Sequence, residues 1–226
     1  MGVEVRIPLG EGRGGAISGY LAEPVGATGA ALVVVQEIFG VNGHVRSVVD
    51  RFAERGFRVL APALFDVVEA GVELGYDAAG VERGRELAQA LGFDAAVDAV
   101  AAAAAFLDAP GATGVVGFCW GGTVAFLGCT RLGLPAVSYY GSRSVPFLGE
   151  PARAPMVFHF GERDHLITPA HVAEHRRLQP QAELYVYPAG HGFNCDRRGD
   201  FEPESAALAW QRTLEFFARH LPAGVR

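Results

Sequence analysis

The sequence predicts a doubly wound, mostly parallel α/β sheet with helices on both faces and an N-terminal antiparallel hairpin. Continuous apolar runs such as 30–35 are typical of strands buried on both faces of a parallel sheet. These runs alternate with helical stretches along most of the chain, which is the order that produces parallel strands joined by helical crossovers. No Pro/Ser-rich linker interrupts the pattern. We therefore expect a single α/β domain over residues 1–226.

Hydrophobic periodicity and turn residues predict the individual elements. Residues 3–7 alternate as a half-buried strand should, and residues 17–22 are expected to pair with them across the turn region Gly10–Gly15. Residues 64–80 lack periodicity, as do crossover insertions that overhang a binding site. The remaining expected strands are 30–35, 57–60, 113–117, 135–140, 155–160 and 183–187. The expected helices are 45–54, 82–91, 93–107, 121–131, 169–178 and 204–219, the last with an apolar face through Leu208, Leu214 and Phe217.

Composition and charge exclude several classes of function. The 226 residues are 50% hydrophobic and 19% charged, which suffices for a full core. A formal net charge of −6 argues against nucleic acid or an anionic membrane as a partner. The three cysteines cannot all pair, which favours a reducing compartment. We see neither a signal-peptide pattern nor an unbroken apolar run of transmembrane length, and so expect a cytoplasmic, monomeric protein.

One short stretch, Gly117–Gly122, has the form of a nucleophile elbow. Small residues two positions before and after Cys119 would permit the sharp strand-to-helix turn of a G-x-S-x-G motif, with cysteine in the place of serine. The same pattern also fits a buried, inert cysteine. Its meaning therefore depends on what the rest of the chain supplies.

Polar residues follow several of the predicted strands. Ligands of an open parallel sheet bind beyond the carboxyl ends of the strands, so these residues are expected to lie near one another. In chain order they are Glu37, Cys119, Tyr140, Asp164 and His191. Nucleophile, acid and histidine then occur in the order of α/β-hydrolase triads.

These residue types match the needs of acyl transfer. Cys119 would attack as a thiolate, and His191 would take the thiol proton and later pass one to the leaving alkoxide. Asp164 would fix the imidazole tautomer and stabilise its charged form. Backbone N–H groups of Trp120 and Ile38 are expected to form the oxyanion hole.

Other readings remain open at several positions. Glu162 competes with Asp164 for the acid role, and Glu37 could serve only to cap its loop. His159 lies within a predicted strand and is expected to be a satisfied core histidine, and Cys129 a small core residue. His165, His171 and His175 are interpreted as surface or helix residues, because no third metal ligand accompanies the i, i+4 pair.

Taken together, the motifs resemble the dienelactone hydrolase (carboxymethylenebutenolidase) family. The resemblance implies an α/β-hydrolase fold, a Cys119-His191-Asp164 triad and a Glu37 that helps to generate the thiolate when substrate binds. It also implies cofactor-free hydrolysis of a small ester or lactone in the cytoplasm, and we expect Phe39, Tyr140 and Arg85 to contact the substrate. The matching segments are Gln36–Asn42, Gly117–Gly122, Tyr139–Gly141, Gly161–His165 and Ala189–Phe193.

The chain departs from the family at the residues that hold a substrate carboxylate. Cys195 and Val81 stand where the family has two arginines, Arg85 stands at a tyrosine position and Gly192 at a serine position. Three further arginines could supply a replacement charge: Arg83, Arg197 and Arg198. The reaction type is thus predicted more firmly than the substrate.

Two competing functions are compatible with parts of the sequence. A binding or thiol-sensing protein on a hydrolase scaffold would keep the site but not the turnover. A nucleotide-phosphate loop at the glycine-rich turn is disfavoured, because neither G-x-G-x-x-G nor G-x-x-x-x-G-K-[ST] is present.

Overall fold

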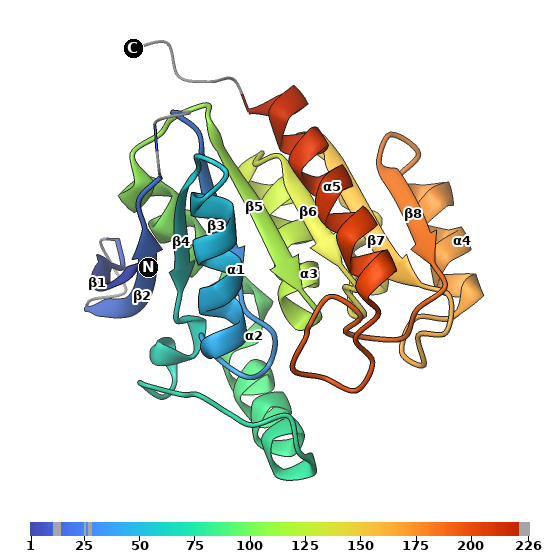
Figure 1. Ribbon diagram of the computed structural model, residues 1–226, viewed down its shortest axis with the longest axis horizontal. Helices are drawn as coiled ribbons and strands as arrows, with labels where there is room; N and C mark the ends of the chain where they lie inside the picture. The colour runs from blue at the N-terminus through green and yellow to red at the C-terminus, as the bar shows by residue number, and fades with distance from the viewer. Residues whose placement is uncertain (11–14, 25, 27–28, 222–226) are drawn as a thin grey trace. The chain divides into compact units, whose positions relative to one another are not determined.

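The computed structural model describes residues 1–10, 15–24, 26 and 29–221. Within it the chain forms two compact units, Met1–Gly114 joined by Leu221, and Val115–His220. Each unit is a sheet covered by helices, and Figure 1 gives the labels used below. The expected single domain over 1–226 stays a prediction.

The first unit contains the strands β1, β2, β4 and β3, which lie side by side in that order. Strand β1 (Val3–Pro8) pairs antiparallel with β2 (Ala16–Ala22), which confirms the predicted hairpin, while residues 11–14 of its expected turn lie outside the described residues. β2 is antiparallel to β4 (Arg58–Pro62), and β4 is parallel to β3 (Ala31–Val35), in which every residue is buried.

Two helices cover the sheet of the first unit on opposite faces (Figure 1). Helix α1 (Gly43–Ala53) is capped by Asn42, whose side chain accepts hydrogen bonds from His44 and Val45 N–H, so it begins two residues before the predicted start. Helix α2 (Ala78–Leu107) contains a non-helical residue, Gly92, with φ 71°, where the sequence predicts a break between two helices. A short 3₁₀ helix, η1 (Leu64–Val67), lies in the stretch predicted to be irregular.

Helix α2 is also long and apolar enough to span a membrane, with a mean hydropathy of 1.7 over its most apolar window. Length and composition alone are weak evidence for a membrane, because core helices of water-soluble proteins pass the same test. Asp94 and Asp98 interrupt the apolar residues within this helix.

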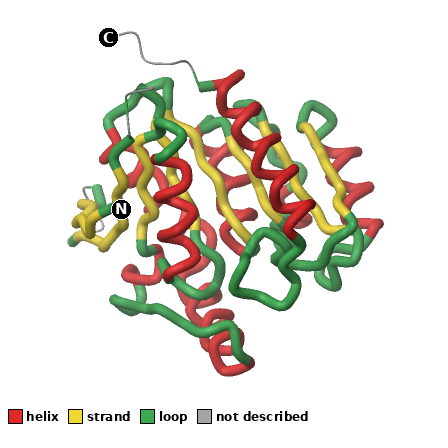
Figure 2. Tube along the Cα trace, in the orientation of Figure 1, coloured by secondary structure: helices red, strands yellow, loops and turns green. Residues whose placement is uncertain are grey.

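The second unit contains strands in the order β5-β6-β7-β8, all parallel. Their bounds are β5 Thr113–Phe118, of which the first two residues belong to the first unit, β6 Ala136–Tyr139, β7 Met156–Gly161 and β8 Glu183–Tyr187. Helix α5 (Pro203–His220) crosses one face of this sheet, and α3 (Trp120–Leu127) and α4 (Pro169–Leu178) cover the other (Figures 1 and 2). The predicted bounds of α4 and β8 are confirmed to the residue.

Two predictions about helices of the second unit are wrong in detail. The expected helix 121–131 is α3 followed by a π-helical turn, η2 (Gly128–Leu132), and a 3₁₀ turn η3 (Val145–Phe147) was not predicted. Leu208 does not belong to the buried face of α5, since 42% of its surface is exposed. The buried face of α5 comprises Ser205, Ala206, Ala209, Thr213, Phe216 and Phe217.

Polar residues inside the second unit join α5 to the sheet. His159 of β7 is fully buried, with Nδ1 2.8 Å from the Tyr187 hydroxyl and Nε2 3.2 Å from Thr213 Oγ1. Thr213 Oγ1 also lies 2.7 Å from the Tyr139 hydroxyl. Burial and the positive charge of Arg212 lower the pKa of His159 to about 3, so its ring is neutral. The prediction that His159 is a satisfied core histidine is confirmed.

Candidate active site

The elbow forms where β5 ends and α3 begins. Cys119 lies between them with φ 55° and ψ −120°, a conformation that few residues other than glycine adopt. Its N–H donates to Tyr139 O at 3.0 Å, and its carbonyl accepts from Gly122 N–H at 2.9 Å. The turn is therefore fixed on both sides, and the sulfur projects from the end of the strand.

Glycines make this turn sterically possible. A Cβ on Gly117 would lie 1.9 Å from Gly121 O, and a Cβ on Gly122 would lie 2.7 Å from Tyr139 O. Real Cβ atoms do not approach oxygen so closely, so α3 could not pack this tightly after β5 with side chains at these positions. The predicted reason for a small residue two positions before Cys119 is confirmed at Gly117.

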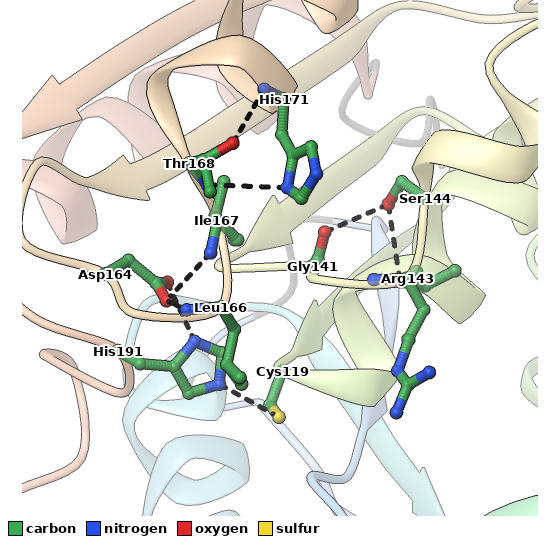
Figure 3. A network of polar contacts seen from close by, with 11 residues as sticks. Cys119, Gly141, Arg143, Ser144, Asp164, Leu166, Ile167, Thr168, His171 and His191 are labelled. Carbon is green, nitrogen blue, oxygen red and sulfur yellow. Dashed lines mark hydrogen bonds and ion pairs between the residues drawn. The ribbon is translucent and has the colours of Figure 1, made fainter.

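The structure brings Cys119, His191 and Asp164 into one line of contacts (Figure 3). His191 Nε2 lies 3.1 Å from Cys119 Sγ, and His191 Nδ1 lies 2.8 Å from Asp164 Oδ2. All three residues are buried, with 8%, 2% and 6% of their surfaces exposed for Cys119, His191 and Asp164. In general, a nucleophile, a base and an orienting acid make contacts of this kind.

The loop after β7 orients Asp164. Its Oδ1 accepts hydrogen bonds from Leu166 N–H at 2.8 Å and Ile167 N–H at 3.2 Å, which leaves Oδ2 directed at the imidazole (Figure 3). Glu162, the competing acid, is exposed. Asp164 is therefore the carboxylate in contact with His191.

The surroundings of His191 favour its protonated form. Burial alone would lower its pKa, but the charge of Cys119 and the hydrogen bonds to Asp164 and Cys119 outweigh burial and raise the pKa to about 10. A protonated ring has N–H groups on both nitrogens, so it can donate to Asp164 and to the sulfur at once. The geometry thus suits a protonated imidazole between the carboxylate and the sulfur.

Aromatic rings surround the imidazole. The Tyr140 ring lies 5.2 Å from the His191 ring in an edge-on arrangement, and the exposed His165 ring lies 5.9 Å from it. Tyr140 has φ 41°, and its N–H donates to His159 O at 2.8 Å. Tyr140 is buried, as is Phe193, whose ring lies 5.5 Å away. The predicted contact residue Tyr140 therefore lies against the imidazole.

Four other predicted residues lie in the first unit: Glu37, Ile38, Phe39 and Arg85. Glu37 and Phe39 are buried and Ile38 is half-buried, all in the loop that follows β3. Arg85 is exposed on the first half of α2. Trp120, the other predicted N–H donor, is the first residue of α3, where backbone N–H groups in general have no acceptor within the helix.

Sequence reasoning missed a network of hydroxyls beside the elbow. Thr123 Oγ1 accepts from Arg143 N–H at 3.1 Å and lies 3.3 Å from Ser144 Oγ. Ser144 Oγ donates to Gly141 O at 3.2 Å (Figure 3). This network ties the loop after β6 to α3. Thr123 and Ser144 are separated by 21 residues, and no motif links them.

The remaining candidates occupy varied positions. Arg198 packs against the backbone beside His191, since a Cβ on Gly192 would lie 2.7 Å from its Cζ, whereas exposed Arg83 pairs with Glu69 and Glu86. His171 caps α4 by accepting from Thr168 N–H, and His175 Nδ1 lies 2.7 Å from His171 O. His175 is buried within α4, so of the two interpretations, a surface or a helix residue, it is a helix residue. Cys129 is buried, as predicted.

Comparison with known proteins identifies the family to which these features belong. The family model described as "Dienelactone hydrolase family" matches residues 17–221. The chain belongs to the dienelactone hydrolase family. Its α/β-hydrolase fold and its nature as a carboxylic ester hydrolase follow from this membership.

Individual relatives of this dienelactone hydrolase family member cover nearly its whole length. A carboxymethylenebutenolidase from a Pseudomonas species is 33% identical over 93% of this chain and 93% of its own. Carboxymethylenebutenolidase 1 from Cupriavidus pinatubonensis is 30% identical over 91% of this chain and 92% of its own. A Klebsiella pneumoniae protein assigned as a dienelactone hydrolase has a crystal structure with a TM-score of 0.84 and 27% identity, covering 97% of this chain and 99% of its own.

Proposed function

We propose that this family member hydrolyses a small ester or lactone, without a cofactor, through Cys119, His191 and Asp164. The observation that supports this most is the chain of two contacts, 3.1 Å from Cys119 Sγ to His191 Nε2 and 2.8 Å from His191 Nδ1 to Asp164 Oδ2. An inert core cysteine would not need a histidine oriented by a buried carboxylate.

In the proposed first half-reaction, the Cys119 thiolate attacks the carbonyl carbon of the substrate, and a tetrahedral oxyanion forms. The C–O bond to the leaving group then breaks as His191 donates its Nε2 proton to the departing alkoxide. An acyl thioester on Cys119 remains. In a lactone the alcohol produced stays attached to the acyl chain, so the ring opens without loss of a fragment.

In the second half-reaction, neutral His191 removes a proton from water, and the resulting hydroxide attacks the thioester. Collapse of the second tetrahedral oxyanion breaks the C–S bond and releases the carboxylic acid. The proton taken from water is now on His191 and the thiolate is restored, so the site returns to its starting state. Asp164 keeps Nδ1 protonated and oriented throughout.

The remaining predicted residues take supporting roles in this proposal. The N–H groups of Trp120 and Ile38 stabilise the oxyanion, and Glu37 assists formation of the thiolate. Phe39, Tyr140 and Arg85 contact the substrate. We further propose that the protein acts as a monomer in the cytoplasm, with one domain over residues 1–226.

The test compares Cys119→Ala and His191→Ala with Cys129→Ala, a matched cysteine substitution outside the site. Turnover of p-nitrophenyl acetate and of small lactones should fall at least about a thousandfold in the first two variants. It should stay near wild type in the third. Circular dichroism checks that the fold persists. Unchanged turnover in Cys119→Ala would exclude the proposal, and wild-type protein that is alkylated by iodoacetamide but shows no esterase burst would favour a thiol-sensing role.

A further inference from the structure

Contacts to backbone carbonyl oxygens fix the conformation of the loop Gln36–Asn42 in the first unit. This loop contains Glu37 and Ile38. Three successive carbonyl oxygens of the loop, those of residues 37–39, each lie against a different group. The Gln36 Nε2 group donates to Glu37 O at 3.3 Å. Leu74 N–H donates to Phe39 O at 3.0 Å. Between these two oxygens in the chain, Ile38 O lies close to Gly84 of α2.

Gln36 links the loop to η1. Its side chain is fully buried, and its Oε1 accepts from Leu64 N–H at 3.1 Å while its Nε2 donates to Glu37 O. Glu37 O and Ile38 N–H belong to the same peptide group and point in opposite directions, because the peptide is planar and trans. A hydrogen bond that fixes the oxygen therefore also fixes the direction of the Ile38 N–H.

Gly84 sets the other side of Ile38. A Cβ on this buried residue would lie 2.1 Å from Ile38 O and 3.1 Å from Ile38 Cβ. The helix can approach the loop this closely only because residue 84 has no side chain. Any larger residue must displace the Ile38 carbonyl and with it the adjoining peptide group.

Residues 72–76 also contact the loop Gln36–Asn42. Gly40 pairs with Glu73, and the Phe39 and Tyr76 rings lie 4.6 Å apart. Asn42 Nδ2 donates to the Tyr76 hydroxyl at 3.0 Å. The insertion after β4, with the start of α2, therefore contacts the loop at several positions between Gln36 and Asn42.

We propose that Gln36 and Gly84 are positioning residues that fix the direction of the Ile38 N–H within the loop Gln36–Asn42. This inference rests on the proposed function, in which the Ile38 N–H is an oxyanion donor. A donor displaced by as little as about 1 Å loses much of its effect on the transition state, although substrate binding changes little. Displacement of the Ile38 N–H should therefore lower kcat and leave KM almost unchanged.

The experiment measures ester turnover and Cys119 alkylation by iodoacetamide in Gly84→Ala and Gln36→Met. Alkylation needs the thiolate but forms no oxyanion. We expect kcat to fall about tenfold to a hundredfold in both variants, with KM and the alkylation rate within about twofold of wild type. Gly43→Ala, at a loop-flanking glycine with nothing within 4 Å of the added Cβ, is the matched control and should match wild type.

Three results would overturn the inference: an unchanged kcat in Gly84→Ala, a rise in KM without loss of kcat, or equal losses in turnover and alkylation. If Gln36→Met fails to fold because Leu64 N–H and Glu37 O lose their partner, Gly84→Ala decides alone. Failure of the proposed function itself looks different, since Cys119→Ala would then retain turnover.

Discussion

His191 Nδ1 lies 2.8 Å from Asp164 Oδ2, and 2% and 0% of the two side chains are exposed to solvent. A hydrogen bond between an imidazole and a carboxylate in such a dry setting fixes which ring nitrogen carries the proton. The other nitrogen, Nε2, then faces the sulfur of Cys119. The hydrogen bond to Asp164 therefore fixes the orientation of the imidazole and contributes, with Cys119, to the raised pKa of His191.

Replacing Asp164 with Asn should lower kcat by about 10² to 10⁴ while the fold persists, because the amide can present its NH₂ to Nδ1 and favour the wrong tautomer. Steady-state kinetics with an aryl ester measure this loss. Glu162→Gln is the matched control, since Glu162 is exposed on the same loop, and it should behave as wild type. The reverse pattern would assign the acid role to Glu162.

The pH dependence of kcat/KM should reflect the raised pKa of His191, about 10 in the folded protein. Loss of that proton removes the acid that protonates the leaving alkoxide. We expect kcat/KM to be level from neutrality to about pH 9 and to decline above it as His191 loses its proton. An alkaline limb near pH 7 would contradict this expectation.

The Gly117→Ala substitution should destabilise the protein by more than about 2 kcal/mol or prevent folding, because the added Cβ would lie 1.9 Å from Gly121 O. Urea unfolding followed by circular dichroism measures the change. Gly149→Ala, where the added Cβ meets nothing within 4 Å, is the same substitution at an open position and should change the free energy of unfolding by less than about 0.5 kcal/mol.

His159 should make stability depend on pH. Its folded pKa is lowered to about 3 from 6.5, so between these values the unfolded chain binds a proton that the folded chain does not. The free energy of unfolding therefore falls as the pH drops below 6.5, by up to about 1.4 kcal/mol per pH unit. Urea titrations at about pH 7 and pH 5 should show a smaller difference in His159→Gln than in wild type.

Much of the fold and the contacts among Cys119, His191 and Asp164 could be predicted, because both leave strong local signals in the sequence. Buried parallel strands are continuous apolar runs, and Cys119 and Asp164 each follow such a strand, whereas His191 follows the partly exposed strand β8. Gly92 interrupts α2 where the periodicity predicts two helices. The choice between Asp164 and Glu162 needed the structure, because both follow the same strand and only the loop geometry turns one inward.

Other features could not be predicted from local sequence. Leu208 is apolar and has the right spacing in α5, but the side of the helix that packs against the sheet decides which residues are buried. Thr213, and not Leu208, lies on that side. The support of the Gln36–Asn42 loop depends on backbone carbonyls and on a missing side chain at Gly84. Contacts of that kind cannot be recognised from residue types, because they involve backbone atoms and the absence of a side chain.

The backbone of Cys119, with φ 55° and ψ −120°, sets catalysis and stability against each other. Such a conformation costs a residue with a side chain about 1 to 3 kcal/mol, a cost that glycine escapes. Cys119→Gly should therefore be more thermostable than Cys119→Ala, although both lack the sulfur. Selection for heat resistance alone would thus tend to remove the nucleophile, and only selection for turnover keeps a cysteine at this position.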